Sequence, residues 1–386
     1  MKPKLRFKNF NNEWEEIELR NIASEIAYGM NSASKEYDGE NKYIRITDID
    51  ENSNRYSNKD VVSPDGILED RFLVKENDIL FARTGASTGK TYLYNSNDGK
   101  LYYAGFLIKA SIINHNSNFI FQQTKLNKYN NWIKIMSMRS GQPGINSQEY
   151  GSYRFSITNI DEENKVSNFL SLIDKKIELQ SKKIEDLKLF KKGLFNNNID
   201  NTKNIKLSDI LTEVNIKSTI NNQYEILSST ANGLYLQKDY FNKQAASENN
   251  TGYKILKRNQ LVLSPQNLWM GNININDKYD IGIVSPSYKI FDIDDNIINI
   301  DFFNNWIKSP RALYDYMISS EQGASVVRRN LNIDLFNEII IKVPERNIQD
   351  KIGKQIKNIN MKIDLENRKL DKLNDLKKGL MQNMFV

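Results

Sequence analysis

The sequence predicts an α+β chain: two duplicated α/β domains separated by two long helices, which form an antiparallel coiled coil with a pseudo-twofold relation between the halves. Three observations favour this fold class. Two charged stretches have the apolar periodicity of long helices, and the second repeats the first at a constant offset. Each stretch is preceded by a segment that mixes short strands with a few helices.

The first long helix is expected over residues 165–198. This stretch has no internal proline, and it spaces its apolar residues three, four or seven positions apart, which is the heptad pattern of a coiled coil. Gln180 and Lys191 stand at two of its core steps. The apolar positions are Val166, Leu170, Ile173, Ile177, Ile184, Leu187 and Leu194.

The second long helix, residues 351–384, repeats the first at an offset of 186 residues. The run Lys-Lys-Gly-Leu at 191–194 returns at 377–380, and Glu366 takes the place of Gln180. A heptad pattern that returns with its polar interruption intact indicates a duplicated gene.

Each helix is about 35 residues long, or about 50 Å at 1.5 Å per residue, so its seam is too long to pack only against its own domain. The simplest partner is the other helix, and packing on a partner protein is a compatible alternative. We expect five residues of one helix to face five of the other. They are Leu170, Ile173, Ile177, Ile184 and Leu187 on the first helix, and Ile356, Ile359, Ile363, Leu370 and Leu373 on the second.

The first domain is expected to alternate strands and helices after a tail and a lead-in segment around Trp14. A short amphipathic helix is predicted at residues 18–26 and a longer one around residues 118–138. Strands are expected at residues 43–47, 78–82 and 106–113.

The second domain repeats this order. Residues 74–81 match residues 256–263, and Gly89 then meets Gly271. We therefore divide the chain into a domain at 1–160, a central helix at 161–200, a second domain at 201–345 and a C-terminal helix at 346–386. Because the helices match closely while the domains differ in their loops, we expect one scaffold role and two recognition roles. Neutral drift of the loops is the alternative.

The composition excludes several classes of site. The chain has no cysteine, so disulfides and thiol chemistry are excluded, and with one histidine, His115, the composition also argues against a zinc site and a serine–histidine triad. We expect His115 to be a surface loop residue. The net charge of +6 favours an acidic partner, nucleic acid first. With no apolar run near the length of a membrane span and no signal peptide, we expect a cytoplasmic protein without a membrane partner.

A glycine-rich loop follows the strand at residues 78–82. It has three residues between its glycines where a phosphate-binding P-loop needs four, and its second copy has no lysine, so nucleotide hydrolysis is rejected. The loop still suits contacts to phosphates or base edges, and an ordinary glycine-rich turn is the alternative. The candidate residues are Arg83, Thr84, Gly85 and Lys90, and those of the second copy are Gln266, Asn267 and Trp269.

A second loop precedes a short amphipathic turn in each domain. Its arginine and amide side chains are those that make bidentate contacts with guanine or adenine. The candidates are Arg139, Gln142 and Asn146 in the first domain, and Arg328 and Arg329 in the second. Asn146 and its counterpart Asn332 are better explained as helix N-caps.

The two long helices end alike, and their charged outer faces are free to bind partner proteins. The alternative is that the end lysines are solvated and interact favourably with the helix dipole. The candidate docking residues are Lys191, Lys192 and Leu194 on the first helix, and Lys377, Lys378 and Leu380 on the second.

In this order and in two copies, these features resemble the specificity (S) subunit of type I restriction-modification enzymes over almost the whole chain. The resemblance is carried by the run at 78–85 with Gly89 and Lys90, by Gln142-Pro143 with Ile145-Asn146, and by the run at 168–174 that leads to Lys191-Lys-Gly-Leu194. The second copy departs from this pattern, because it has Pro265-Gln-Asn267 in place of Arg-Thr-Gly and lacks the Gln-Pro pair.

The resemblance implies two target-recognition domains, each of which reads one half of a bipartite site on double-stranded DNA. The helices would set the spacer between the halves and bind two modification (methyltransferase) subunits, and restriction (motor and nuclease) subunits would join them. S-adenosylmethionine, ATP and Mg²⁺ would be bound by those partners. This chain would bind no cofactor or metal and would not be an enzyme.

A protein of another class is the alternative, namely a coiled-coil adaptor that joins two protein partners and binds no nucleic acid. Salt-dependent retention on DNA distinguishes the two hypotheses in favour of the first. An NTPase that uses the Gly85 loop would be supported only if Lys90→Ala abolished measurable hydrolysis.

Overall fold

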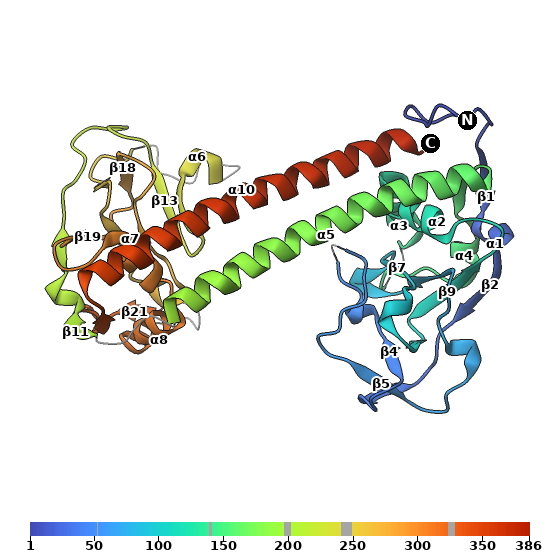
Figure 1. The fold of residues 1–386 in the computed structure, drawn as a ribbon, viewed down its shortest axis with the longest axis horizontal. Coiled ribbons are helices and arrows are strands. Elements are labelled where there is room, and N and C mark those ends of the chain that lie inside the picture. The colour runs from blue at the N-terminus through green and yellow to red at the C-terminus, as the bar shows by residue number, and fades with distance from the viewer. Residues whose placement is uncertain (52, 139–140, 197–201, 241–248, 323–328) are drawn as a thin grey trace. The chain divides into compact units, whose positions relative to one another are not determined.

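The computed structural model describes residues 1–51, 53–138, 141–196, 202–240, 249–322 and 329–386 (Figure 1). The chain forms two compact units. Unit 1 consists of residues 1–181 and 369–386, and unit 2 consists of residues 182–368. Each unit therefore contains one globular domain and a part of each long helix, α5 (Ile160–Asn196) and α10 (Arg346–Met384). Both helices were predicted from their heptad pattern.

Unit 1 is built around a four-stranded antiparallel sheet in the order β2 (Ala23–Tyr28), β9 (Leu107–Ile112), β6 (Asp78–Ala82) and β7 (Thr91–Leu93). The inner strand β6 is buried on both faces. Ile79 and Phe81 contribute to one hydrophobic core, while Leu80 and Ala82 contribute to another. This division follows from the two-residue period of a strand and explains why the sequence after Asp78 is continuously apolar.

Unit 2 repeats this sheet in the order β12 (Leu211–Val214), β19 (Lys289–Ile293), β16 (Leu261–Leu263) and β17 (Ile273–Ile275). In both units an antiparallel pair joins the two ends of the domain: β1 (Glu15–Glu18) with β10 (Arg154–Ile157), and β11 (Lys203–Lys206) with β22 (Ile340–Val343). A turn recurs as well, since Asn77 and Asn259 precede β6 and β16 with φ of 70° and 65°, a left-handed conformation that asparagine tolerates. The domains are duplicates, as the sequence predicted.

The remaining elements of unit 1 cover the sheet or extend it at the surface. The strand pairs are β3 (Ala33–Glu36) with β5 (Val62–Asp65), antiparallel, and β4 (Lys42–Ile44) with β8 (Leu101–Tyr103), parallel. The helices are α1 (Leu19–Ile22), α2 (Ser117–Gln123), α3 (Asn127–Met136) and α4 (Ser147–Ser152), with 3₁₀ turns η1 (Ile46–Asp48), η2 (Asp70–Phe72), η3 (Gly85–Ser87) and η4 (Ser96–Asp98).

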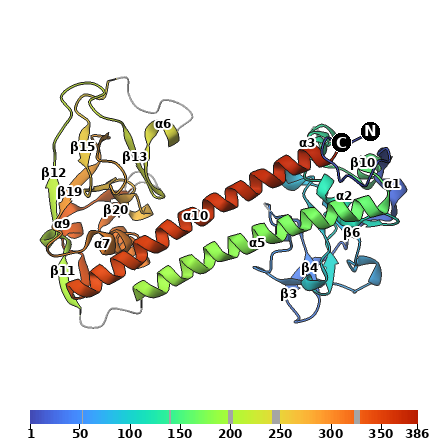
Figure 2. The same cartoon turned by 45° about the horizontal axis from the view of Figure 1, so that its top comes forward.

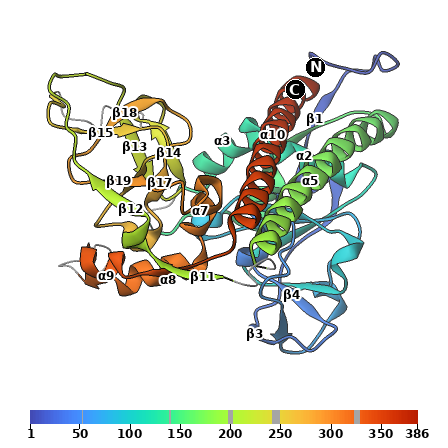
Figure 3. The same cartoon turned by 60° about the vertical axis from the view of Figure 1, so that its left-hand side comes forward.

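Unit 2 differs from unit 1 mainly in its peripheral strand pairs. The extra strand pairs are β13 (Leu227–Thr230) with β14 (Gly233–Leu236), β15 (Lys254–Lys257) with β18 (Ile281–Val284), and β20 (Ser320–Gln322) with β21 (Arg329–Leu331). The helices are α6 (Gln237–Tyr240), α7 (Ile300–Trp306), α8 (Pro310–Ile318) and α9 (Ile333–Asn337), with 3₁₀ turns η5 (Leu207–Asp209) and η6 (Leu268–Met270). In Figure 3, α7 lies between the strands of the sheet and α10.

The helix predicted at residues 18–26 was wrong beyond its first turn. Only α1 is helical, and the chain continues directly as β2, whose residues pair with β9. A single turn is too short to be stable by itself, so strand pairing determines the conformation of the residues that follow.

Two further boundaries differ from those expected. The helix predicted around residues 118–138 is interrupted between α2 and α3, where the Thr124 hydroxyl lies 2.7 Å from the Phe121 carbonyl oxygen and 2.8 Å from the Thr91 hydroxyl. The strand predicted at residues 43–47 ends at Ile44. The Asp48 carboxylate accepts the Arg45 N–H at 2.8 Å and thereby starts η1.

The N-terminal segment packs on unit 1, although the sequence suggested a tail. Trp14 is buried in the core of the unit. Arg6 donates two hydrogen bonds of 2.7 Å to the buried carboxylate of Glu162. Burial alone would raise the pKa of Glu162, but the hydrogen bonds from Arg6 and Thr158 and the charge of Arg6 outweigh it and lower that pKa. The segment is therefore an anchored part of the unit.

The two long helices run antiparallel within each unit. In unit 1, Leu170 near the start of α5 shares a hydrophobic core with Met381 near the end of α10, and Lys377 forms a 2.5 Å ion pair with Asp174. Figure 2 shows α2 against this first part of α5. In unit 2, the buried carboxylate of Glu366 lies 3.0 Å from Lys183 Nζ. No helix in the described part of the chain is long and apolar enough to cross a membrane.

Candidate nucleic-acid interface

The two candidate loops of unit 1 form one surface. Gly85 N–H donates to the Pro143 carbonyl at 3.0 Å, and Ile145 N–H donates to the Arg83 carbonyl at 2.9 Å. Thr84 and Gly144 form a bridge between these two contacts. The sequence singled out both loops, but nothing in it showed that they are joined through their backbones.

Glycines allow the first of these loops to fold. Gly85 has φ of +71° and lies directly beneath Gln142, whose Nε2 would be 3.0 Å from an added Cβ. Gly89 has φ of +91°, and a Cβ there would lie 2.6 Å from a side-chain carbon of Ile133. Its predicted counterpart Gly271 is also left-handed, with φ of +86°. Both conformations favour glycine, which accounts for the glycines at 85 and 89.

Aromatic and polar side chains line this surface, which we call recognition surface 1 (Tyr28, Arg83, Phe106 and Gln142). The Arg83 guanidinium carbon lies 4.8 Å from the centre of the Tyr28 ring, and Arg83 N–H donates to the Phe106 carbonyl. Tyr28 and Phe106 are 41% and 62% exposed, which is high for aromatic residues. Such residues suit stacking on bases and sugars beside a cation. Sequence reasoning missed both aromatics, because Tyr28 follows a segment that was read as helix.

Lys90 is directed inward and not toward solvent. Its ammonium group donates to the Ile49 carbonyl at 3.1 Å and lies 3.5 Å from a Glu51 carboxylate oxygen. The side chain is only 13% exposed. Lys90 therefore fastens the loop to the domain, whereas Arg83 at the other end of the loop is half-buried against Tyr28.

The N-cap interpretation of the two asparagines is confirmed. Asn146 Oδ1 accepts Glu149 N–H at 2.9 Å, and Glu149 accepts Asn146 N–H at 2.8 Å in return. Asn332 Oδ1 accepts Asp334 N–H at 3.1 Å. Both side chains thereby start the helices α4 and α9, so their oxygens are committed to capping.

The corresponding loops of unit 2 also meet, but with other side chains. Arg329 N–H donates to the Gln266 carbonyl at 3.3 Å. We call Gln266, Asn267, Trp269 and Met270 recognition surface 2; Gln266 is exposed, Asn267 and Trp269 are half-buried, and Met270 is 49% exposed. The Arg329 side chain turns back to donate to the Ser320 carbonyl at 2.7 Å. Arg139 and Arg328 lie outside the described residues.

A half-buried lysine holds the turn that directly follows recognition surface 2. Lys308 Nζ donates to the carbonyls of Gly271 at 2.8 Å and Ala231 at 3.1 Å, and burial lowers its pKa to about 8. Lys125 follows α2 as Lys308 follows α7; burial, and then the charge of Lys377, lower the pKa of Lys125 to about 8. Neither lysine was singled out from the sequence, since only the packing removes them from water.

The ten predicted seam residues of the long helices all avoid full exposure. Leu170, Ile184, Ile356 and Ile359 are buried, and the other six are half-buried. Leu170 and Ile173 pack in or against the core of unit 1, whereas Ile356 packs in the core of unit 2. The seam residues near each domain therefore also attach the helices to that domain.

The predicted docking residues divide into two groups. Lys192 and Lys378 are exposed, whereas Lys377 is paired with Asp174 and Leu380 packs against the core of unit 1. Lys191 and Leu194 are half-buried, and burial lowers the pKa of Lys191. Only part of each Lys-Lys-Gly-Leu run is thus directed to solvent.

The long helices expose several large apolar side chains, among them Leu172, Leu189 and Met361, but only two of the described positions are exposed and apolar in both copies. They give each unit one such side chain from each long helix. The docking pair of unit 1 is Leu179 and Leu376, which are 58% and 53% exposed, and that of unit 2 is Leu365 and Phe190, which are 51% and 59% exposed. At the repeat offset, Leu179 matches Leu365 and Leu376 matches Phe190. Because they recur at equivalent positions, these side chains are the candidates for a surface that both units share.

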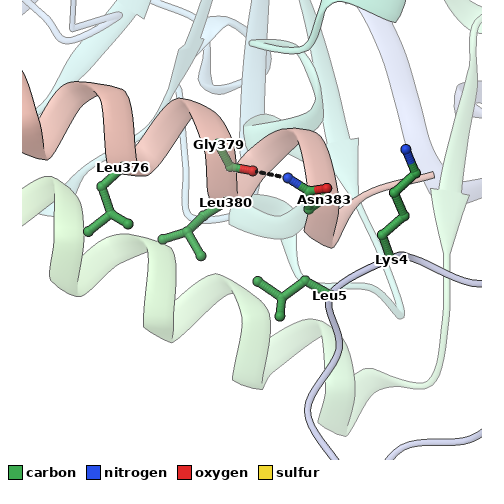
Figure 4. Close-up of a pocket in the computed structure, with 6 residues that line it drawn as sticks. All are labelled: Lys4, Leu5, Leu376, Gly379, Leu380 and Asn383. Carbon is green, nitrogen blue, oxygen red and sulfur yellow. Dashed lines mark hydrogen bonds between the residues drawn. The ribbon is translucent and has the colours of Figure 1, made fainter.

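In unit 1, a shallow pocket adjoins the docking pair (Figure 4). The side chains of Leu5, Leu376 and Leu380 point into it, and Asn383 Nδ2 donates to the Gly379 carbonyl at 2.7 Å along its wall. The N-terminal segment supplies the remaining side through Lys4 and Leu5.

The single histidine has a carboxylate partner. His115 lies in a loop, as expected, but its Nδ1 is 2.9 Å from the buried carboxylate of Glu163, so it is partnered and half-buried and not a bare surface residue. Throughout the part of the chain that the structure describes, no three histidine, aspartate or glutamate side chains lie together as metal ligands would.

Residues 11–189 match the family model described as the type I restriction modification DNA specificity domain. This region, which runs from β1 to most of α5, therefore matches the DNA specificity domain of type I restriction-modification systems. By this match the chain is similar to the specificity (S) subunits of those systems.

Solved structures show the same fold over the full chain. A type I restriction-modification S subunit from M. genitalium is 16% identical, with a TM-score of 0.62 over 100% of this chain and 99% of that one. A second structure, from a study of complex assembly and conformational transition in a type I system, is 11% identical, with a TM-score of 0.52 over 96% of this chain and 97% of that one.

Proposed function

We propose that this chain is the sequence-recognition subunit of a type I restriction-modification complex, in which each domain reads one half of a bipartite site on double-stranded DNA. One observation carries the proposal. Two units with the same sheet order each join the same two loops into one surface, yet the side chains on those surfaces differ. Two domains with the same fold but different side chains at their recognition surfaces are what two half-sites of different sequence require.

Recognition surface 1 favours contact with guanine or adenine. An arginine can donate to guanine O6 and N7 together, and a glutamine can make the corresponding pair of bonds with adenine. Arg83 and Gln142 supply these two groups at the junction of the loops. Recognition surface 2 has no such arginine among its four residues and supplies the amides of Gln266 and Asn267, so we expect its half-site to be read through adenine and not through guanine.

The docking pairs support binding of two copies of one partner. Because Leu179 with Leu376 repeats as Leu365 with Phe190, a methyltransferase subunit that fits one pair fits the other. We propose that two modification subunits bind there and that restriction subunits join the assembly. The study of complex assembly in a type I system concerns a protein of this fold.

We propose that the chain is not an enzyme and that S-adenosylmethionine, ATP and Mg²⁺ are bound by the partner subunits. The glycine-rich loop supports this division of labour. Its only lysine, Lys90, is bound to Ile49 and Glu51 within the domain and is not free to reach a nucleotide phosphate.

The decisive experiment maps methylated bases in DNA from cells that express this chain with its methyltransferase partner. We expect two short half-sites separated by a fixed gap. Arg83→Ala should weaken discrimination in one half-site by about fivefold or more, since a bidentate contact contributes about 1–3 kcal/mol, and should leave the other half unchanged. Gln266→Ala is the matched variant and should relax only the opposite half.

A continuous single site, or variants that relax both halves equally, would contradict the assignment. Retention on DNA that does not change with salt concentration, or no retention, would favour a protein adaptor instead, because phosphate contacts release counterions and depend on salt.

A further inference from the structure

Each domain is fastened to its long helix by one asparagine with three roles. In unit 1, Asn116 N–H donates to Glu163 Oε2 at 2.9 Å and Asn116 Nδ2 donates to Asn164 Oδ1 at 2.6 Å. Asn116 Oδ1 accepts Phe119 N–H at 2.9 Å and so caps α2. We call Asn116, Glu163 and Asn164 the clamp of unit 1.

Unit 2 contains the same arrangement. Asn299 N–H donates to Gln349 Oε1 at 2.8 Å, and Asn299 Nδ2 donates to Asp350 Oδ1 at 2.9 Å. Asn299 Oδ1 accepts Phe302 N–H at 2.9 Å and caps α7. Asn299, Gln349 and Asp350 are the clamp of unit 2, and each member stands where its counterpart stands in unit 1.

A third contact lies further along the same helices. Asn118 Nδ2 donates to Ser171 Oγ at 2.7 Å in unit 1. In unit 2, Lys357 Nζ lies 3.5 Å from Asp301 Oδ2. At the repeat offset Ser171 corresponds to Lys357, so the position of the contact has been kept while its chemistry has changed.

Two of the three clamp positions differ between the units, since Glu163 and Asn164 correspond to Gln349 and Asp350. The change from Glu163 to Gln349 is matched by a change outside the clamps. In unit 1, the Glu163 carboxylate also accepts Thr158 N–H at 3.2 Å. The corresponding residue of unit 2 is Pro344, which has no N–H to donate. There the glutamine amide donates in the opposite direction, from Gln349 Nε2 to the Pro344 carbonyl at 2.9 Å. Glu163 and Gln349 therefore each bond to the backbone of the residue five positions earlier, Thr158 or Pro344. The side chain accepts this hydrogen bond in unit 1 and donates it in unit 2.

Directional bonds of this kind fix rotation in a way that apolar packing does not. Phe302 of α7 and Ile352 of α10 share a hydrophobic core, but the hydrophobic effect is non-directional, whereas hydrogen bonds weaken steeply when misaligned. A rotation of about 10° moves a point about 20 Å away by about 3.5 Å, close to the rise of one base pair of about 3.4 Å. A small error at the helix would therefore be an error of one base pair at the DNA.

We infer that the two clamps set the orientation of each domain on its helix and thereby restrict the complex to one gap between half-sites. The inference rests on the proposed function and goes beyond it, because it places the precision of the gap in the domain–helix contacts as well as in helix length. The six clamp residues are positioning residues and need not touch DNA.

Gln349→Glu tests the inference in the complex with the methyltransferase partner. The new carboxylate would face the Pro344 carbonyl oxygen in a buried site, and two acceptors repel each other. We expect methylation at sites with gaps one base pair longer or shorter to rise at least tenfold, with both half-sites unchanged. The double variant Pro344→Thr/Gln349→Glu restores the donor seen in unit 1 and should return the gap to its single value.

Gln382→Glu is the matched control, since it makes the same change at an exposed position of α10 and should keep one gap. Lys357→Ala tests the same contact surface more gently, because it removes only an exposed ion pair, and should broaden the gap less. If all variants kept one gap at any level of methylation, the inference would fail while the proposed function stood. A wild-type pattern without two half-sites would instead overturn the proposed function.

Discussion

Lys308 and Lys125 occupy the same position in the two domains, directly after α7 and α2, and both are largely removed from water. Lys308 holds the carbonyls of Ala231 and of Gly271, which directly follows recognition surface 2. A lysine whose pKa is lowered by burial makes folding less favourable while it carries its charge. The contribution of Lys308 to the stability of unit 2 therefore depends on pH.

Lys308→Met should reduce the increase in the free energy of unfolding that the wild type shows as the pH rises above about 8. The unfolded lysine keeps its proton up to about pH 10.5, whereas the folded one loses it near pH 8. The unfolded state thus binds more protons in this window, and stability rises as pH increases from about 8 toward 10.5. The variant lacks this rise, which amounts to at most about 1.4 kcal/mol per pH unit.

Urea unfolding of the wild type and the variant between pH 7 and 10 measures the difference. Lys354→Met, which removes an exposed lysine of α10 in the same unit, is the control and should keep the wild-type slope. Equal slopes for Lys308→Met and the wild type would show that this buried cation does not titrate as proposed.

The sequence predicted residue types at this scale better than their directions. It identified Arg83 and Lys90 as donors in one loop, yet Lys90 points into the domain. The left-handed Gly89 before it redirects the chain, and the receiving carbonyl of Ile49 is distant in sequence. Likewise, the heptad pattern says nothing about Asn116 and Asn299, because their partners lie about 50 residues further along the chain.

At the scale of elements, the polar interruption of the heptads has a structural role. Glu366 stands on the apolar side of α10, is buried, and bonds to Lys183 of α5 at 3.0 Å. A buried polar group on one helix that needs a partner on the other favours one register of the pair over its neighbours. This explains why the apolar repeat is broken at that step.

Lys183→Met should destabilise unit 2 by about 1–2 kcal/mol, since it removes a charged partner of Glu366, while the exposure of the lysine limits the loss. Combining it with Glu366→Leu should recover most of the loss, because a well-packed apolar pair can replace a buried ion pair. Urea unfolding of the single and double variants measures this coupling. Lys182→Met removes the neighbouring exposed lysine and should change stability by less than about 0.5 kcal/mol; an equal effect of both lysines would contradict the role of Glu366.

Long periodic elements were the best predicted and short ones the worst. Both long helices were found where the heptads place them, because about ten turns of consistent pattern outweigh local exceptions. The segment at 18–26 has apolar residues compatible with helix or strand, and its pairing with β9 is decided by residues more than 80 positions away. The break between α2 and α3 depends on the bonds of Thr124, which no local pattern encodes.

At the scale of the whole molecule, duplication is the organising fact. Both domains have one sheet order, one pairing of their ends and one clamp. The sequence predicted the duplication from its constant offset, and it also predicted which loops would differ. The antiparallel helix pair that it predicted also agrees with each compact unit containing parts of both helices.

Seven-residue insertions in both long helices should lengthen the gap in the DNA site without changing the half-sites. Seven residues add about 10 Å of helix, or about three base pairs at about 3.4 Å each, and a whole heptad preserves the apolar seam. Methylation mapping gives the gap directly. Four-residue insertions of similar composition are the control, because they shift the seam and should lower methylation; an unchanged gap with seven residues would show that helix length does not set the spacing.

The pairing of α10 with the first domain has a consequence for biosynthesis. Phe385 packs against Trp14 and Phe119 in the core of unit 1, so that core is completed by residues that leave the ribosome after all of unit 2. Unit 2 is continuous in sequence and can fold on the nascent chain, whereas unit 1 must wait with an open apolar face. A chain truncated before the last turns of α10 would have an incomplete core in its N-terminal domain. We therefore expect chaperones to bind the N-terminal domain and not the C-terminal one.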